Sequence, residues 1–98
     1  MKFATITTDQ MVKLQEVEIN RFVISKESMD KVAEILELNG KDPKELTAVR
    51  NTIVKFYSDK ADEAREAFDW DEFDANHIRM SGITAVIDNI LFNMGALY

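Results

Sequence analysis

The chain has 98 residues, of which 46% are hydrophobic and 31% are charged, so it can fold alone around one hydrophobic core. Its net charge is −6 and it contains no cysteine, which excludes disulfides and thiolate metal sites and predicts a reducing, cytoplasmic location. The sequence shows no membrane-spanning stretch, no secretory signal, and no basic stripe for direct binding of nucleic acid or anionic lipid. We therefore expect one domain over residues 1–98.

The first predicted element is a helix over about residues 9–23. A polar run at residues 8–10 is typical of a helix entry. Two apolar residues, Leu14 and Val17, lie off the predicted face, and residues 3–8 are rich in β-formers, so a short extended N-terminal segment stays open as an alternative. The predicted apolar face covers about a third of the helical circumference and consists of Met11, Val12, Ile19, Phe22 and Val23.

Two further helices have stronger start and stop signals. Ser25 can cap a helix whose apolar residues recur at three- and four-residue spacing, and residues 39–40, Asn-Gly, supply a left-handed stop. Residues 42–45, Asp-Pro-Lys-Glu, combine an N-cap, a proline at the first helical position and a glutamate at the third. The apolar stripe of this third helix continues to about residue 68, although a break at residues 58–59 would divide it in two.

The last predicted helix begins after the capping residue Asp69 and runs to Met94, with Gly95 as its stop. Gly82 lies inside this helix, where glycine costs about 1 kcal/mol relative to alanine, and therefore indicates a bend or a close helix crossing. The elements together predict an all-α fold, an irregular bundle of four to five helices. The core-facing residues predicted for the last helix are Ile78, Ile83, Val86, Ile87, Ile90, Leu91 and Met94.

The sequence carries no catalytic or metal-binding motif. His77 is the only histidine, and no nucleophile motif lies near it. The acidic run at residues 69–74 does not match a calcium-binding loop, because Phe73 and Asp74 occupy the positions that require an oxygen ligand and a glycine. The three glycines form no phosphate-binding loop. We expect no catalytic residue, no metal site and no cofactor, and hence a protein that is not an enzyme.

Negative charge and aromatic rings gather in one segment. Residues 59–74 contain eight acids and two bases, whereas the other 82 residues contain ten of each. Phe68, Trp70 and Phe73 are interleaved with these acids. An exposed tryptophan within a negative patch is typical of a docking surface, because aromatic anchors supply binding energy and charge speeds the encounter. The alternative is that Phe68 and Phe73 complete the core and the acids form a solvated face.

The main functional hypothesis is a regulatory or inhibitory protein-binding module that docks a basic partner protein through an acidic-aromatic helical corner. A second hypothesis is mimicry of nucleic acid by the carboxylates, although the neutral remainder of the chain counts against it. Short acidic chains without a catalytic site are often phage-encoded. The residues predicted to bind the partner are Asp62, Glu66, Asp69, Trp70, Asp71, Glu72 and Phe73.

The C-terminal end offers a second candidate surface. Phe92 falls opposite the core stripe of the last helix, and Leu97 and Tyr98 follow just beyond Gly95. These three side chains could contact a second copy of the chain. A self-assembling homo-oligomer or virion-associated structural protein is therefore the alternative function.

Overall fold

The computed structural model describes residues 6–20 and 24–95, and these residues form four helices and no strand. The all-α class is therefore confirmed for the described residues. A fifth helix is not confirmed, and neither is an extended segment over residues 3–8, because Thr8 already belongs to the first helix and residues 3–5 lie outside the described residues. The helices are α1 (Thr8–Gln15), α2 (Lys26–Ile35), α3 (Pro43–Glu66) and α4 (Trp70–Asn93).

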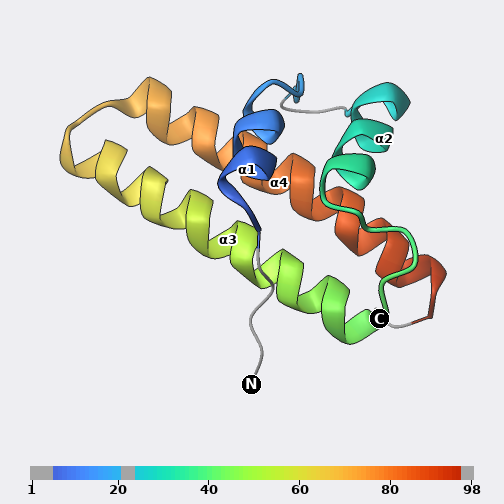
Figure 1. Ribbon diagram of the computed structural model, residues 1–98. Coiled ribbons are helices and arrows are strands. Elements are labelled where there is room, and N and C mark those ends of the chain that lie inside the picture. Colours follow the sequence, from blue (N-terminus) through green and yellow to red (C-terminus); the bar gives the residue numbers. More distant parts are fainter. Residues whose placement is uncertain (1–5, 21–23, 96–98) are drawn as a thin grey trace.

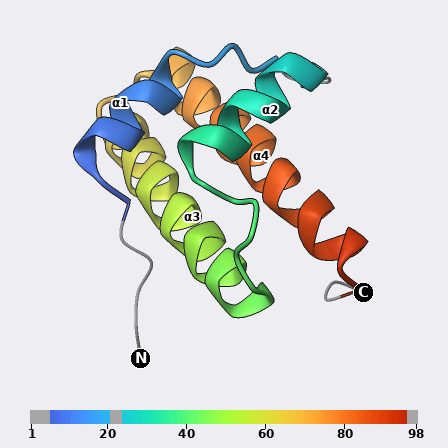
Figure 2. The same ribbon diagram turned by 45° about the vertical axis from the view of Figure 1, so that its right-hand side comes forward.

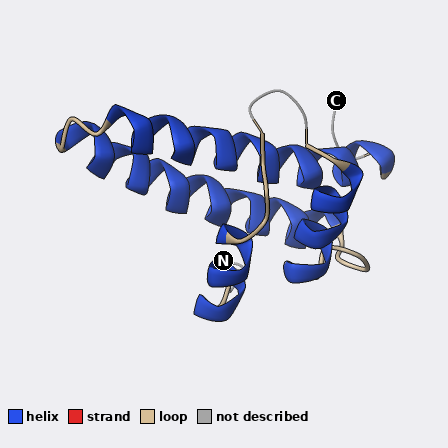
Figure 3. Cartoon of the chain, turned by 90° about the horizontal axis from the view of Figure 1, so that it is seen from above, coloured by secondary structure: helices blue, strands red, loops and turns tan. Residues whose placement is uncertain are grey.

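The two long helices, α3 and α4, form an antiparallel hairpin (Figure 1). Only residues 67–69 connect them, and so short a connection makes consecutive helices neighbours that run in opposite directions. The break considered at residues 58–59 does not occur, since α3 is continuous to Glu66. The short helices α1 and α2 lie across one side of the hairpin (Figures 2 and 3), and the turn end of the hairpin extends beyond them.

The core lies between the hairpin and the two short helices. Tyr57 is fully buried in it and its hydroxyl accepts a hydrogen bond of 3.1 Å from Gln15 Nε2. Met94, which was predicted to face the core, is 48% exposed because it caps the end of α4. None of the helices in the described ranges combines the length and apolarity needed to cross a bilayer. The core cluster consists of Leu14, Val17, Val32, Leu36, Leu38, Leu46, Val49, Ile53, Tyr57, Ile83, Val86, Ile87 and Leu91.

The first helix is shorter than the predicted span of residues 9–23, because α1 ends at Gln15. The predicted apolar face was wrong in part: Met11 and Ile19 pack against the core as predicted, but Leu14 and Val17 are buried and Val12 is 55% exposed. Leu14 is buried within α1 itself, whereas Val17 lies beyond the end of the helix and enters the core from the irregular segment that follows. The end of α1 is held by Arg79 of α4, whose guanidinium donates a hydrogen bond to the carbonyl oxygen of Leu14. The predicted face residues Phe22 and Val23 lie outside the described residues.

The second helix begins as predicted, with Ser25 Oγ accepting a hydrogen bond of 3.1 Å from the Ser28 N–H. It stops earlier than the Asn39-Gly40 signal suggested. Glu37 adopts the left-handed conformation (φ 52°), and the N–H of Leu38 donates to the carbonyl oxygen of Ala33 at 2.9 Å. This pattern is a Schellman motif, in which a residue just past the helix turns left-handed so that the last carbonyls find donors. The early stop lets Leu38 enter the core.

Gly82 marks a close approach within an unbroken helix. The segment after α1 crosses α4 at this point, and a Cβ atom at position 82 would overlap the Cγ2 atom of Ile19. The missing side chain therefore lets residues 17–20 lie against α4. The sequence predicted a bend or a close helix crossing here; the structure shows a close crossing, but its partner is an irregular segment and not a helix.

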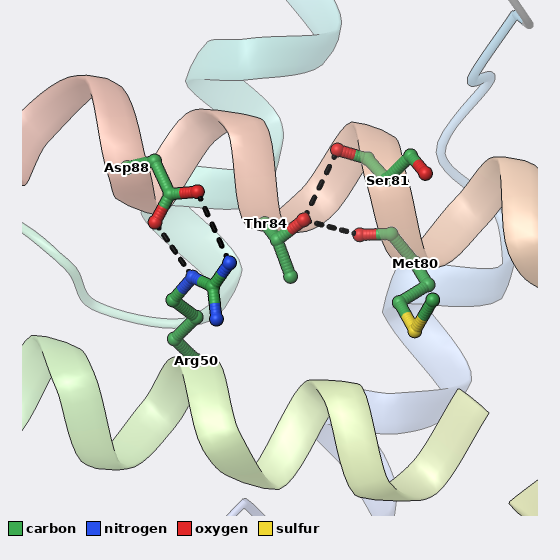
Figure 4. Close-up of polar contacts among 5 residues, drawn as sticks. All are labelled: Arg50, Met80, Ser81, Thr84 and Asp88. Carbon is green, nitrogen blue, oxygen red and sulfur yellow. Dashed lines mark hydrogen bonds and ion pairs between the residues drawn. The ribbon is translucent and has the colours of Figure 1, made fainter. Parts of the chain in front are cut away.

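An ion pair joins the two helices of the hairpin (Figure 4). Arg50 on α3 donates from Nε to Asp88 Oδ1 at 2.6 Å and from Nη2 to Asp88 Oδ2 at 3.3 Å. This two-pronged geometry fixes the register of α3 against α4 more tightly than a single contact. The hydroxyl of the buried Thr84 donates to the Met80 carbonyl oxygen at 2.8 Å, which satisfies a polar group in the helix interface.

We expect Gly82→Ala to destabilise the fold by about 1–3 kcal/mol, because the overlap with Ile19 outweighs the better helix propensity of alanine. In an Ile19→Ala background the same substitution should be neutral or stabilising, since the clashing atom is gone. Urea unfolding of the four proteins of this cycle measures both effects. Equal costs of Gly82→Ala in the two backgrounds would contradict the contact.

Candidate functional site

The predicted partner-binding residues lie together at the turn end of the α3–α4 hairpin. A second Schellman motif makes this turn: the N–H of Phe68 donates to the Arg65 carbonyl oxygen at 3.0 Å, and the N–H of Asp69 donates to the Ala64 carbonyl oxygen at 2.8 Å. Asp69 then caps α4, its Oδ1 accepting from the Glu72 N–H at 3.2 Å. Phe68 is therefore the single residue between Ala67, the C-cap of α3, and Asp69, the N-cap of α4.

The turn gathers the acidic residues at one end of the molecule. All eight acids of residues 59–74 are exposed, and they come from the last turns of α3, the connection and the first turns of α4. The segment has a balance of −6, which equals the formal charge of the whole chain. Because the other residues are neutral in sum, their charge does not offset the negative potential at this end of the molecule.

Several of these carboxylates also have local structural roles. Asp62 pairs with Arg65 at 3.6 Å, Asp69 caps α4, and Glu72 Oε1 accepts from the Nδ2 of the buried Asn76 at 3.3 Å. Glu66 and Asp71, by contrast, pair with no side chain of the described residues. Among the carboxylates predicted to bind the partner, these two are the ones without a hydrogen bond or ion pair from their side chain to the described residues.

Three aromatic side chains follow one another along the first turns of α4. Trp70 meets Phe73 edge to face with ring centroids 5.6 Å apart, and Phe73 meets His77 with centroids 4.6 Å apart. Positions three and four apart share a helix face, so the rings form a continuous file. Trp70 is 55% exposed and Phe73 is half-buried, so the file runs along the border between the core and the solvent.

Phe68 is the residue that the predicted site omitted. It was considered as part of the core, but its side chain is 79% exposed and its backbone is left-handed (φ 56°). Left-handed backbone is the usual role of glycine, and a bulky residue there is strained. The sequence contained a signal for the exposure of Phe68. If one helix ends just before position 68 and Asp69 caps the next, position 68 must make the turn between them, where a left-handed backbone is common. We define the acidic-aromatic corner as the seven predicted residues together with Phe68.

The second candidate surface lies at the opposite end of α4. Phe92 is 65% exposed, as expected from its position opposite the core stripe, and Met94 beside it is 48% exposed. The other two predicted contact residues, Leu97 and Tyr98, lie outside the described residues. The described part of this end thus exposes two large apolar side chains, whereas the turn end exposes aromatic rings within a strongly negative segment.

The described residues show no arrangement suited to metal binding. Nowhere in residues 6–20 and 24–95 do three His, Asp or Glu side chains come together in a way that could hold an ion. His77 contacts the ring of Phe73. That the chain lacks a metal, a cofactor and a catalytic activity stays a prediction.

Comparisons of the chain with protein-family models, curated proteins and solved structures found no match. Function must therefore be inferred from the chemistry of the surface. The corner offers exposed aromatic carbon for burial and a negative field for attracting cations, and this combination suits recognition of another macromolecule.

We expect Phe68→Gly to stabilise the fold by about 1 kcal/mol, because glycine removes the left-handed strain and the exposed ring contributes little burial. Phe68→Ala keeps the strain and should lie within about 0.5 kcal/mol of the native chain. Glu37→Gly, at the other left-handed position, is the matched control and should also stabilise. Urea unfolding measures all three, and a loss of more than about 1 kcal/mol for Phe68→Gly would show that the ring packs on the fold.

Proposed function

We propose that this chain is a non-enzymatic protein-binding module of the cytoplasm, regulatory or inhibitory in effect, that docks a basic partner protein through the acidic-aromatic corner. The observation that carries the proposal is the exposure of Phe68 and Trp70, 79% and 55%, at the end of the molecule where the net negative charge is concentrated. The core of the fold does not use these rings, and Phe68 is held there in a strained backbone.

The two parts of the corner would contribute differently to binding. Covering the exposed parts of two large rings removes on the order of 300 Å² from water, which contributes roughly 7 kcal/mol before the costs of association are subtracted. The surrounding carboxylates contribute less to affinity, but they accelerate the encounter with a basic surface and fix its orientation. Binding should therefore weaken as the salt concentration rises and should depend most on Trp70.

The test compares two double variants of equal chemistry. Trp70→Ala with Asp71→Lys removes a ring and reverses a charge at the corner, whereas Phe92→Ala with Asp30→Lys makes the same changes elsewhere, at exposed positions. Proteins captured from a cell extract by the native chain are purified and their affinity is measured directly. We expect a basic protein whose affinity falls at least a hundredfold with the corner variant and less than threefold with the control.

Two results would count against the proposal. If both variants bind like the native chain, the corner is not the docking surface. If the Phe92 variant alone loses binding, the interaction belongs to the C-terminal end of α4. Circular dichroism and urea unfolding of both variants establish that the fold is retained.

Self-assembly through the C-terminal end of α4 is the second candidate, and the exposure of Phe92 and Met94 is the observation that favours it. In that case sedimentation equilibrium should show association of the native chain at high concentration. Phe92→Ser should shift the equilibrium toward monomer, because it removes the most exposed large apolar side chain that the structure describes at that end. A native chain that stays monomeric at millimolar concentration would exclude this candidate.

A further inference from the structure

We propose that the corner selects arginine over lysine in its partner, with guanidinium groups lying on the rings of Phe68 and Trp70 and donating to the neighbouring carboxylates. This inference rests on the proposed docking function and names the side chain that the corner recognises. Three features of the corner support it: exposed aromatic rings, two carboxylates that pair with no side chain of the described residues, and neighbouring cations that already have contacts elsewhere.

The ring faces at the corner are open. Phe73, which meets Trp70 edge to face, can cover at most one face of it, and Trp70 remains 55% exposed. Phe68 contacts no other ring of the described residues and is 79% exposed. The faces of an aromatic ring carry partial negative charge. An exposed ring face beside carboxylates therefore attracts a cation both through the ring and through the carboxylates.

The cations of the described residues near the corner do not neutralise its charge. Arg65 pairs with Asp62. Lys60 Nζ lies 5.2 Å from the ring centroid of Phe56, one turn earlier on α3. The carboxylates of Glu66 and Asp71, which flank Phe68 and Trp70 in the sequence, have no side-chain partner in the part of the chain that the structure describes. A cation from a partner protein is the group that complements both the rings and these two acids.

Guanidinium fits this combination better than ammonium. Its planar group stacks flat on a ring while its edge N–H groups point outward to a carboxylate, so one arginine can use both features together. It is also weakly hydrated and loses little on leaving water. Lysine carries a compact, strongly hydrated charge, and at an exposed site it keeps its water in preference to the ring.

The chain supplies its own reporter for the test, because Trp70 is its only tryptophan. We would titrate the native chain at low salt with a peptide of four Arg-Gly-Ser repeats and, separately, with one of four Lys-Gly-Ser repeats, which has equal length and charge. We expect the arginine peptide to bind about tenfold more tightly and to change the Trp70 emission, since two stacked contacts each favour arginine severalfold.

Three variants at single positions separate ring recognition from charge. Phe68→Leu keeps an apolar side chain but removes the ring face, and it should lower the preference for arginine to about threefold while leaving the lysine affinity unchanged. Phe68→Tyr restores a ring and should restore the preference. Phe92→Leu, the same change at the far end of α4, should have no effect on either peptide.

The outcomes distinguish this inference from the proposed function. Equal affinities for the two peptides, both falling steeply with salt, would overturn the arginine preference and leave docking of a basic partner supported. Retention of the preference in Phe68→Leu would also overturn it, because stacking on that ring would then play no part. If neither peptide binds, the inference fails, and the capture experiment with the corner variant decides the proposed function separately.

Discussion

Two hydrogen bonds at the end of α3, from the Phe68 N–H to Arg65 and from the Asp69 N–H to Ala64, reverse the chain and send α4 back along α3. The antiparallel contact that results provides the surface on which everything else packs, including the crossing of Ile19 over Gly82. The same turn places Phe68 and Trp70 on either side of Asp69, and Figure 1 shows that this turn is at the end of the hairpin farthest from α2. The folding constraint and the candidate site are therefore the same short piece of chain.

Hydrogen bonds at helix ends join α1 to the hairpin and to α2, in addition to the contacts in the core. Arg79 donates to the last turn of α1, Gln15 donates to the buried hydroxyl of Tyr57, and Gln10 Nε2 donates to the Ile35 carbonyl oxygen at the end of α2 at 3.0 Å. The last carbonyl groups of a helix have no donor within the helix. Here Arg79 and Gln10, from other helices, donate to the carbonyl oxygens of Leu14 and Ile35. Two helices too short to be stable alone are thus held on the hairpin.

The sequence predicted the long helices well because their ends depend on local chemistry. The run at residues 42–45 and the cap at Asp69 satisfy nearby N–H groups whatever the rest of the fold does, and both start helices as expected. The span of α1 was wrong because its end is decided by distant partners: Val17 and Ile19 leave the helix to meet the core and α4. The stop at Glu37 was missed because a non-glycine residue takes the left-handed position there.

At the corner, local chemistry explains only part of what is observed. Asp69 and Glu72 would be expected in any hairpin that needs a helix cap and a partner for Asn76, so their presence says little about function. A chain selected for stability alone would favour glycine at position 68 and a polar residue at position 70. Phe68 and Trp70 oppose both preferences, and covering them with a partner would recover the free energy that the isolated fold loses by exposing them. The two rings, and not the abundance of carboxylates, are therefore the strongest indication that this end of the molecule binds something.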